Sequence, residues 1–91
     1  MSLLVVGLEA GQDDQVKMYP NPSHGWVEFD FGNLQDIAIR VFGLDGKIVY
    51  QEQGITASQH RVWLEGPGGI YFVEVTADEW TQPKRFKLVK M

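Results

Sequence analysis

Apolar and polar residues alternate one by one through most of this chain, and this period of two constrains its fold more than any other feature. In WVEFDF, residues 26–31, the residues Val27, Phe29 and Phe31 fall on one face of an extended chain. Successive side chains of a strand point to opposite faces, whereas a helix needs apolar residues three and four positions apart. Similar alternation occurs in DIAIRVF (36–42), KIVYQEQ (47–53), HRVWL (60–64), GIYFVEVTA (69–77) and PKRFKLVK (83–90). No window of three helical turns is amphipathic, so we expect an all-β fold.

Turn signals separate these segments at intervals of about ten residues. Asp45-Gly46, between two alternating runs, predicts a tight hairpin because glycine adopts positive φ without steric cost. Gly32-Asn33, Gly54 and residues 66–69 mark further turns. With QVKMY (15–19) as a first strand, the chain has about seven short strands, which is typical of a β-sandwich of the immunoglobulin or fibronectin kind.

The apolar faces of these strands define the expected core. It consists of Val27, Phe29, Ile37, Ile39, Val41, Ile48, Tyr71, Val73, Val75 and Phe86. The final strand is expected to bury Phe86 and Leu88 while Arg85 and Lys87 face outward.

Two prolines precede the first long alternating run. Each fixes its own φ near −65° and favours an extended conformation in the residue before it. Neither Pro20 nor Pro22 has a backbone N–H to donate, so Tyr19-Pro20-Asn21-Pro22 is expected at a sheet edge or between strands. Gly25 then supplies the turn before Trp26. We therefore expect a rigid corner over residues 19–25.

Size and composition narrow the class of protein. A chain of 91 residues with 44% hydrophobic residues forms one small globular domain, and its net charge of −4 offers no basic face for nucleic acid. The absence of cysteine excludes disulfides and thiolate metal sites. LLVVGL, residues 3–8, is too short to span a membrane and lacks the preceding basic residues of a signal peptide. Residues 1–18 are interpreted as an artificial start, a linker or the tail of an upstream domain.

Several residue pairs suggest chemistry, but each has a simpler interpretation. The neighbours Ser23-His24 are assigned to a solvated turn, and the isolated His60 to the start of a strand without a catalytic role, because nothing in the sequence orients either histidine as a base. Asp13-Asp14 and Asp78-Glu79 lack the ligand spacing of a calcium loop.

Glu28 and Asp30 share one strand face at a separation of about 7 Å. Some glycosidases place two carboxylates at such a distance. Nothing else in the sequence indicates a catalytic cleft, so we expect these carboxylates to pair with arginine or lysine across the sheet. No enzyme activity, cofactor or metal site is predicted.

Four segments occur in a distinctive order: YPNPSHG (19–25), IRVFGLDGKIVYQ (39–51), GPGGIYFVEV (66–75) and the basic strand KRFKLVK (84–90). Together they resemble the C-terminal sorting domain of the type IX (Por) secretion system of Gram-negative bacteria. The resemblance covers about residues 19–91, which we take as the domain. Residues 3–18 fall outside the pattern, and the stretch before Gly69 has more glycine than is usual.

The resemblance implies a non-catalytic signal at the C-terminus of a larger cargo protein. Its implied partners are the outer-membrane secretion machinery, a sortase-like peptidase that removes it and the upstream cargo domain. The cargo would pass through the periplasm and end at the cell surface or outside the cell, with no insertion of this domain into the membrane. The residues expected to carry recognition are Tyr19, Pro20, Asn21, Pro22, Gly25, Asp45, Gly46, Lys47, Gly69, Tyr71, Lys84, Arg85, Lys87 and Lys90.

A different class of function remains open. Trp26, Trp63 and Trp80 lie opposite the main core series or in a turn, and exposed aromatic rings on a sandwich stack on sugars in many carbohydrate-binding modules. The alternative function is therefore that of an accessory carbohydrate-binding or adhesive module that uses these tryptophans. The simpler interpretation is that these rings cover the outer face of a sheet or pack beneath a loop.

Overall fold

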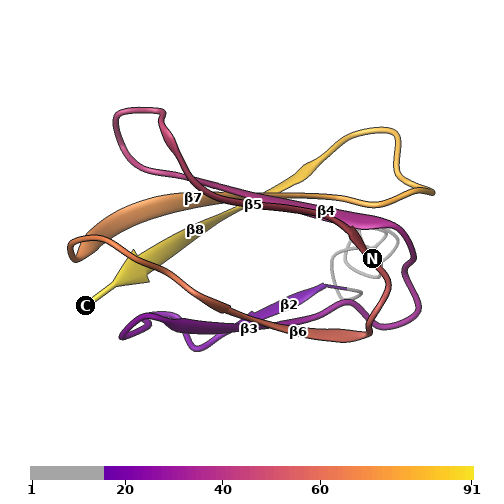
Figure 1. The fold of residues 1–91 in the computed structure, drawn as a ribbon, viewed down its shortest axis with the longest axis horizontal. Helices are drawn as coiled ribbons and strands as arrows, with labels where there is room; N and C mark the ends of the chain where they lie inside the picture. The colour runs from indigo at the N-terminus through magenta and orange to yellow at the C-terminus, as the bar shows by residue number, and fades with distance from the viewer. Residues whose placement is uncertain (1–15) are drawn as a thin grey trace, which may run out of the picture.

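Residues 16–91 are described by a computed structural model, in which they form seven strands and no helix (Figure 1). The strands are β2 (Lys17–Tyr19), β3 (Trp26–Asp30), β4 (Ile37–Phe42), β5 (Ile48–Ile55), β6 (Gln59–Trp63), β7 (Gly69–Thr76) and β8 (Lys84–Lys90). They form a three-stranded sheet, β2-β3-β6, and a four-stranded sheet, β5-β4-β7-β8, and every pairing is antiparallel. The prediction of an all-β sandwich is confirmed. Asp13-Asp14 lies outside the described residues.

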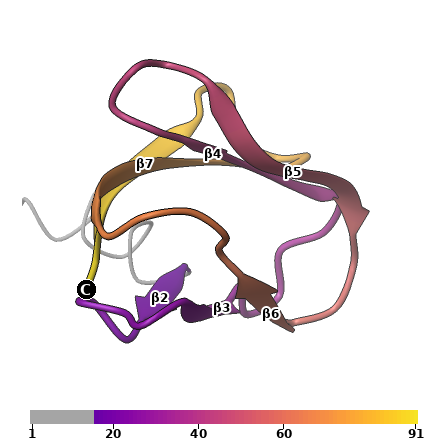
Figure 2. The ribbon, with the colours of Figure 1, turned by 60° about the vertical axis from the view of Figure 1, so that its left-hand side comes forward.

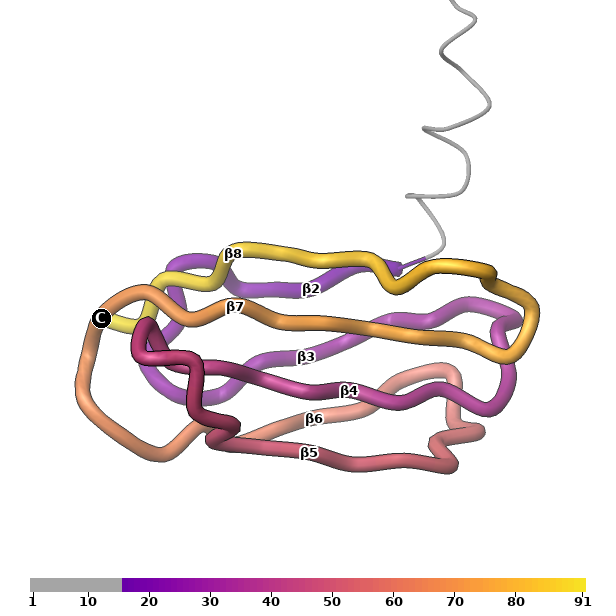
Figure 3. The backbone as a smooth tube through the Cα atoms, turned by 90° about the horizontal axis from the view of Figure 1, so that it is seen from above, coloured from indigo at the N-terminus to yellow at the C-terminus, as the bar shows by residue number. Residues whose placement is uncertain are grey.

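The two sheets face each other as separate layers (Figure 2). The chain changes sheet at three connections, namely after β3, after β5 and after β6. Seen from above, the strands of the two sheets run in roughly the same direction along the long axis of the molecule (Figure 3). Strands that alternate in hydrophobicity have one apolar face each, and stacking the two sheets buries the apolar faces of both.

The core lies between the layers. It contains Val16, Val27, Phe29, Phe31, Leu34, Ile37, Ile39, Val41, Ile55, Val62, Leu64, Tyr71, Val73, Val75, Ala77 and Leu88. The predicted core residues are therefore buried, with the exceptions of Ile48 and Phe86. Phe86 is half-buried and packs against the core cluster.

Ile48 was expected in the core, and that prediction is wrong because its side chain is 45% exposed. In the β4–β5 pairing Val41 opposes Tyr50, but Phe42 opposes Ile48, so one residue of β5 is left over between them. Such a bulge reverses the face to which the following side chain points. Ile48 consequently shares the outer face with Phe42, while Tyr50 packs against the core.

The predicted hairpin joins β4 and β5. The Gly43 N–H donates to the Lys47 carbonyl at 2.9 Å, and the Gly46 N–H donates to the Gly43 carbonyl at 3.0 Å. Gly46 has a φ of +85°, the conformation for which glycine was expected. The Asp45 carboxylate accepts the Lys47 N–H at 3.0 Å and closes the turn.

The proline-containing segment connects β2 with β3. It therefore lies between two strands, which is one of the two placements predicted for it. Both peptide bonds that precede its prolines, Tyr19-Pro20 and Asn21-Pro22, are cis. Lys17 and Met18 pair with Asp30 and Phe29 in the three-stranded sheet, so β2 begins two residues before the predicted domain start. The assignment of residues 19–91 as the domain stays a prediction.

Candidate functional site

The segment Asn21–Ser23 is attached to the outer edge of β8. The Asn21 side-chain amide donates to the Lys87 carbonyl at 2.9 Å, and its oxygen accepts the Val89 N–H at 3.0 Å. The Ser23 N–H donates to the Val89 carbonyl at 2.8 Å, and the Ser23 carbonyl accepts the Met91 N–H at 2.7 Å. Figure 2 shows the C-terminal end of the chain beside the β2–β3 connection. We call these four hydrogen bonds the β8 clasp.

Ser23 is fully buried, so its assignment to a solvated turn is wrong, whereas the neighbouring His24 is exposed. The Ser23 hydroxyl donates to the Trp26 carbonyl at 2.7 Å and accepts the Gly25 N–H at 2.9 Å. A buried hydroxyl needs such partners because an unpaired one costs about 1–3 kcal/mol. Ser23 therefore organises the corner rather than acting as a nucleophile.

Gly25 is required by two independent features. Its φ is +133°, which residues with a side chain rarely adopt, and a Cβ there would lie 2.6 Å from the Trp63 ring. Its carbonyl accepts the Leu64 N–H at 2.8 Å, which ties the corner to the end of β6. The Trp63 ring thus covers Gly25.

Tyr71 is buried, and its hydroxyl donates to the Pro67 carbonyl at 2.6 Å. A Cβ on Gly66 would lie 2.9 Å from that hydroxyl, so the glycine-rich stretch allows the loop to approach the tyrosine closely. Gly69 starts β7 with a φ of +145°. Tyr71 and Gly69 therefore shape the loop that leads into β7, whereas Asp45, Gly46 and Lys47 are exposed at a hairpin tip.

The four basic residues of β8 have different surroundings. Arg85 and Lys87 lie on the outer face, as predicted, and their side chains are exposed. Lys90 is half-buried, donates to the Gly66 carbonyl and lies 6.0 Å from the centre of a Trp63 ring. Lys84 is half-buried and also has an interaction partner. Arg85 and Lys87 therefore carry the cationic groups of this strand that are presented to solvent.

Glu74 of β7 is buried between two arginines, which the sequence analysis did not foresee. Its carboxylate contacts the Arg40 guanidinium at 2.5 Å and the Arg85 guanidinium at 3.1 Å. The hydrogen bonds from Arg40, and then those from Arg85, hold the pKa of Glu74 below its ordinary value of 4.5 against the opposing effect of burial. The three strands of this ion cluster are neighbours in the four-stranded sheet.

His60 lies near the start of β6, as predicted, and is half-buried. Its Nε2 lies 3.0 Å from the Glu52 carboxylate and 3.3 Å from the Tyr50 hydroxyl, so it joins an edge strand of one sheet to an edge strand of the other. The Tyr50 hydroxyl also donates to Glu52. That bond lowers the pKa of Glu52, while burial and then the Glu52 carboxylate raise the pKa of Tyr50.

The tryptophans do not form a flat platform. Trp26 and Trp63 are 52% and 44% exposed, but their rings meet edge to face at 60° with centroids 5.0 Å apart. The Arg61 guanidinium lies 5.5 Å from the centre of the Trp26 ring, and Trp63 rests on Gly25. Trp80 is half-buried against the core. The rings mainly cover the three-stranded sheet, as the simpler interpretation held.

The remaining candidates for chemistry have structural partners. Glu28 contacts the Arg61 side chain at 2.5 Å across the β3–β6 pair, as expected, and Asp30 accepts the Gly32 N–H at 3.0 Å. Within residues 16–91 no group of three or more histidine, aspartate or glutamate side chains is placed to hold a metal ion. That same part of the chain has no helix of the length and apolarity needed to cross a bilayer.

The described residues thus define a small all-β sandwich domain in which the predicted motifs close the edge of β8 and shape two of the turns. The comparison with known families makes this specific: the model of the secretion system C-terminal sorting domain matches residues 17–89. The chain belongs to this family, the type IX secretion sorting domains that its motifs resemble. No curated protein matches the chain in a sequence comparison.

Proposed function

We propose that this domain is the sorting signal by which the outer-membrane secretion machinery recognises a larger cargo protein, which is fused to the N-terminal side of the domain. The domain accompanies the cargo through the periplasm and across the outer membrane. A sortase-like peptidase then removes it, and the cargo remains at the cell surface or leaves the cell. In this function the domain itself performs no chemistry.

The observation that carries the proposal is the family match over residues 17–89. The β8 clasp gives this match a physical meaning, because it joins the proline-containing motif at one end of the pattern to the basic strand at the other. A receptor that reads the folded domain therefore meets both motifs together, on one edge of one sheet. Recognition of the folded state is consistent with a signal that has to be presented next to cargoes of many kinds.

The test is export of a reporter. The complete 91-residue chain is fused behind a monomeric fluorescent protein that carries a periplasmic signal peptide, in a host with a type IX secretion system. We expect fluorescence at the cell surface or in the medium, with none in a host that lacks the system. Removal of the domain is measured separately, as a loss of mass near the 10.3 kDa of the chain.

The controls separate export from processing. The reporter without this chain should stay in the periplasm. If the fused reporter also stays there although the purified fusion is folded, the sorting function is wrong. Export without the loss of mass contradicts only the removal step.

A further inference from the structure

The outer face of the four-stranded sheet carries several exposed large apolar side chains. Phe42 of β4 and Phe72 of β7 are directly opposed in the sheet register, and Phe72 is 41% exposed. Ile70 of β7, and Ile48 of the edge strand β5 that pairs with β4, are further exposed large apolar side chains on this face. Soluble monomers rarely gather such side chains on one face, and where they do the patch is often a binding site.

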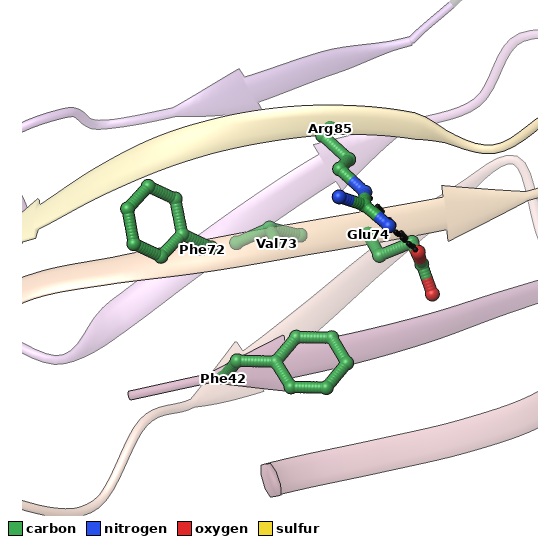
Figure 4. A pocket seen from close by; sticks show the side chains of 5 residues that line it. All are labelled: Phe42, Phe72, Val73, Glu74 and Arg85. Carbon is green, nitrogen blue, oxygen red and sulfur yellow. Dashed lines mark hydrogen bonds and ion pairs between the residues drawn. The ribbon is translucent and has the colours of Figure 1, made fainter. Parts of the chain in front are cut away.

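A hollow of about 370 Å³ lies on this face and is lined by Phe42, Phe72, Val73, Glu74 and Arg85. Figure 4 shows the ring of Phe72 on β7, that of Phe42 on the adjacent strand, and Arg85 reaching across to Glu74. This volume lies near the lower end of the range of ligand pockets, about 300–1,000 Å³, and is large enough for one bulky side chain. We call this site the Phe42–Phe72 hollow.

The rim of the hollow is cationic although the whole chain is acidic. Arg40, Arg85 and Lys87 lie on the outer face, and among the strand residues that the register places there Glu74 is the one acidic group. Glu74 is shared by the two arginines. Arg85 is nevertheless 75% exposed, and the Arg40 guanidinium lies 5.5 Å from the centre of the Phe42 ring. The face thus keeps an excess of positive charge beside an apolar hollow.

We propose that the Phe42–Phe72 hollow is the docking site for a protein partner, and that the partner inserts an apolar side chain flanked by carboxylates. The apolar side chain replaces water between the two rings, and the carboxylates meet Lys87 and the exposed edges of Arg40 and Arg85. The inference rests on the proposed function, since it assigns to the export receptor the chemistry of its contact with this domain. The receptor segment is acidic and aromatic or aliphatic, and it lies on the face of the sheet.

An anionic membrane has related chemistry but fits this site less well. A bilayer takes up apolar side chains that protrude beyond their surroundings. Here the apolar surface is a hollow beside the Arg85–Glu74 pair, so a flat surface would not fill it. The observations therefore favour a peptide segment, and lipid is retained as an outcome of the test.

The first experiment measures binding without secretion. The purified 91-residue chain, labelled with ¹⁵N, is titrated with the acetylated peptide Asp-Glu-Phe-Asp-Glu and with a version in which serine replaces phenylalanine. We expect shifts of the amide signals of β4, β7 and β8 with the first peptide. Phe72→Ser and Lys87→Glu should each weaken its association by about fivefold or more. Trp26→Ser removes a comparably exposed ring from the opposite sheet and should change the association less than about twofold.

Three results would overturn the docking site. One is the absence of shifts, or shifts confined to the three-stranded sheet. Another is equal binding of the two peptides. The third is binding of the chain to phosphatidylglycerol vesicles, lost in Phe72→Ser, with no binding of the peptide, because lipid would then be the occupant.

The second experiment places the same variants in the export assay. Export of the Phe72→Ser and Lys87→Glu fusions should fall about fivefold, in parallel with the affinity, while Trp26→Ser is exported normally. If all three are exported like the unchanged fusion, the docking site is wrong and the sorting function stands. If the unchanged fusion is not exported, the sorting function is wrong, and the peptide titration alone decides the docking site.

Discussion

The side-chain oxygen of Asn21 accepts the backbone N–H of Val89 at 3.0 Å, across 68 residues of sequence. Pro20 and Pro22 on either side of it have no N–H, so this stretch offers fewer backbone donors to the edge of β8 than an ordinary strand does. The Asn21 amide supplies the missing donor by binding the Lys87 carbonyl. The alternation of proline and asparagine therefore provides a short, rigid cap for the edge of β8.

Replacing Asn21 with alanine should destabilise the domain by about 1–2 kcal/mol. The change removes both side-chain hydrogen bonds of the β8 clasp and leaves the two bonds of the Ser23 backbone. The loss is moderate because the site is exposed and water can bind the freed backbone groups. Urea unfolding followed by tryptophan fluorescence gives the free energy of unfolding.

Two variants make this measurement specific. Asn21→Asp keeps the acceptor for the Val89 N–H but turns a carboxylate oxygen toward the Lys87 carbonyl in place of the donor, so its stability should lie below that of the wild type. His24→Ala changes an exposed neighbour on the same connection and should have little effect. Equal stabilities of Asn21→Ala and His24→Ala would show that the clasp does not stabilise the fold.

Replacing Gly25 with alanine should cost about 2–4 kcal/mol, since it adds backbone strain and overpacking. The new Cβ would lie 2.6 Å from the Trp63 ring at a φ of +133°. Gly46→Ala is the matched control, because Gly46 also has a positive φ but nothing lies within 4 Å of an added Cβ. It should cost only about 1 kcal/mol.

A double-mutant cycle separates the two causes at Gly25. If the clash with the ring matters, Gly25→Ala should cost less in a Trp63→Ala background than in the wild type. The same cost in both backgrounds would assign the whole effect to the backbone conformation.

The sequence predicted which strand residues face the core better than it predicted the contacts between segments that are far apart in the chain. Alternation is a local property, so Val27, Phe29 and Val73 could be assigned to the core from their neighbours alone. Ile48 was misplaced because a bulge changes the face of one residue and leaves no mark in the hydrophobic pattern. The Asn21–Val89 bond and the burial of Ser23 depend on which distant segments meet. Only the family resemblance indicated that the motifs at the two ends of the pattern belong together.

The candidate site was predictable in part for the same reason. Arg85 and Lys87 could be placed on an outer face from the alternation of β8. The Phe42–Phe72 hollow could not, because it needs the register between β4 and β7, which are separated by two other strands in the sequence. The burial of Glu74 likewise needs arginines from two different strands.

The contribution of Glu74 to stability should disappear in acid. Its pKa in the folded domain lies below the ordinary value of 4.5, so folding is favoured by the ionised form. This stabilisation is complete above about pH 4.5, the unfolded value, and is lost as the pH falls through the folded pKa. Glu74→Gln should therefore be less stable than the wild type at pH 7 by about 1–3 kcal/mol. The two stabilities should converge below pH 4.5.

Free energies of unfolding from pH 7 down to pH 3 test this dependence. Glu79→Gln removes a negative charge from the exposed β7–β8 connection and serves as the control. A difference between wild type and Glu74→Gln that stays constant with pH would contradict the ion cluster as its source.

The loss of an aromatic ring should destabilise the domain more between the sheets than on the outer face of a sheet. Phe29→Ala should cost about 3–5 kcal/mol, because it opens a cavity between the sheets. Phe29 is 1% exposed, whereas Phe72 is 41% exposed. Phe72→Ala should consequently change the free energy of unfolding by less than about 1 kcal/mol. The reverse order would indicate that the strands are shifted by one residue, since such a shift exchanges their faces.

Soluble oligosaccharides should leave the tryptophan fluorescence of the domain unchanged. A sugar ring stacks on an aromatic face, but the 60° angle between Trp26 and Trp63 offers no common plane. One face of Trp63 is also occupied by Gly25, and Arg61 lies over Trp26. Titration with cello-, chito- and manno-oligosaccharides measures any response. A saturable change that is lost in Trp63→Ala would instead establish the domain as a carbohydrate-binding module and would place its site on the three-stranded sheet.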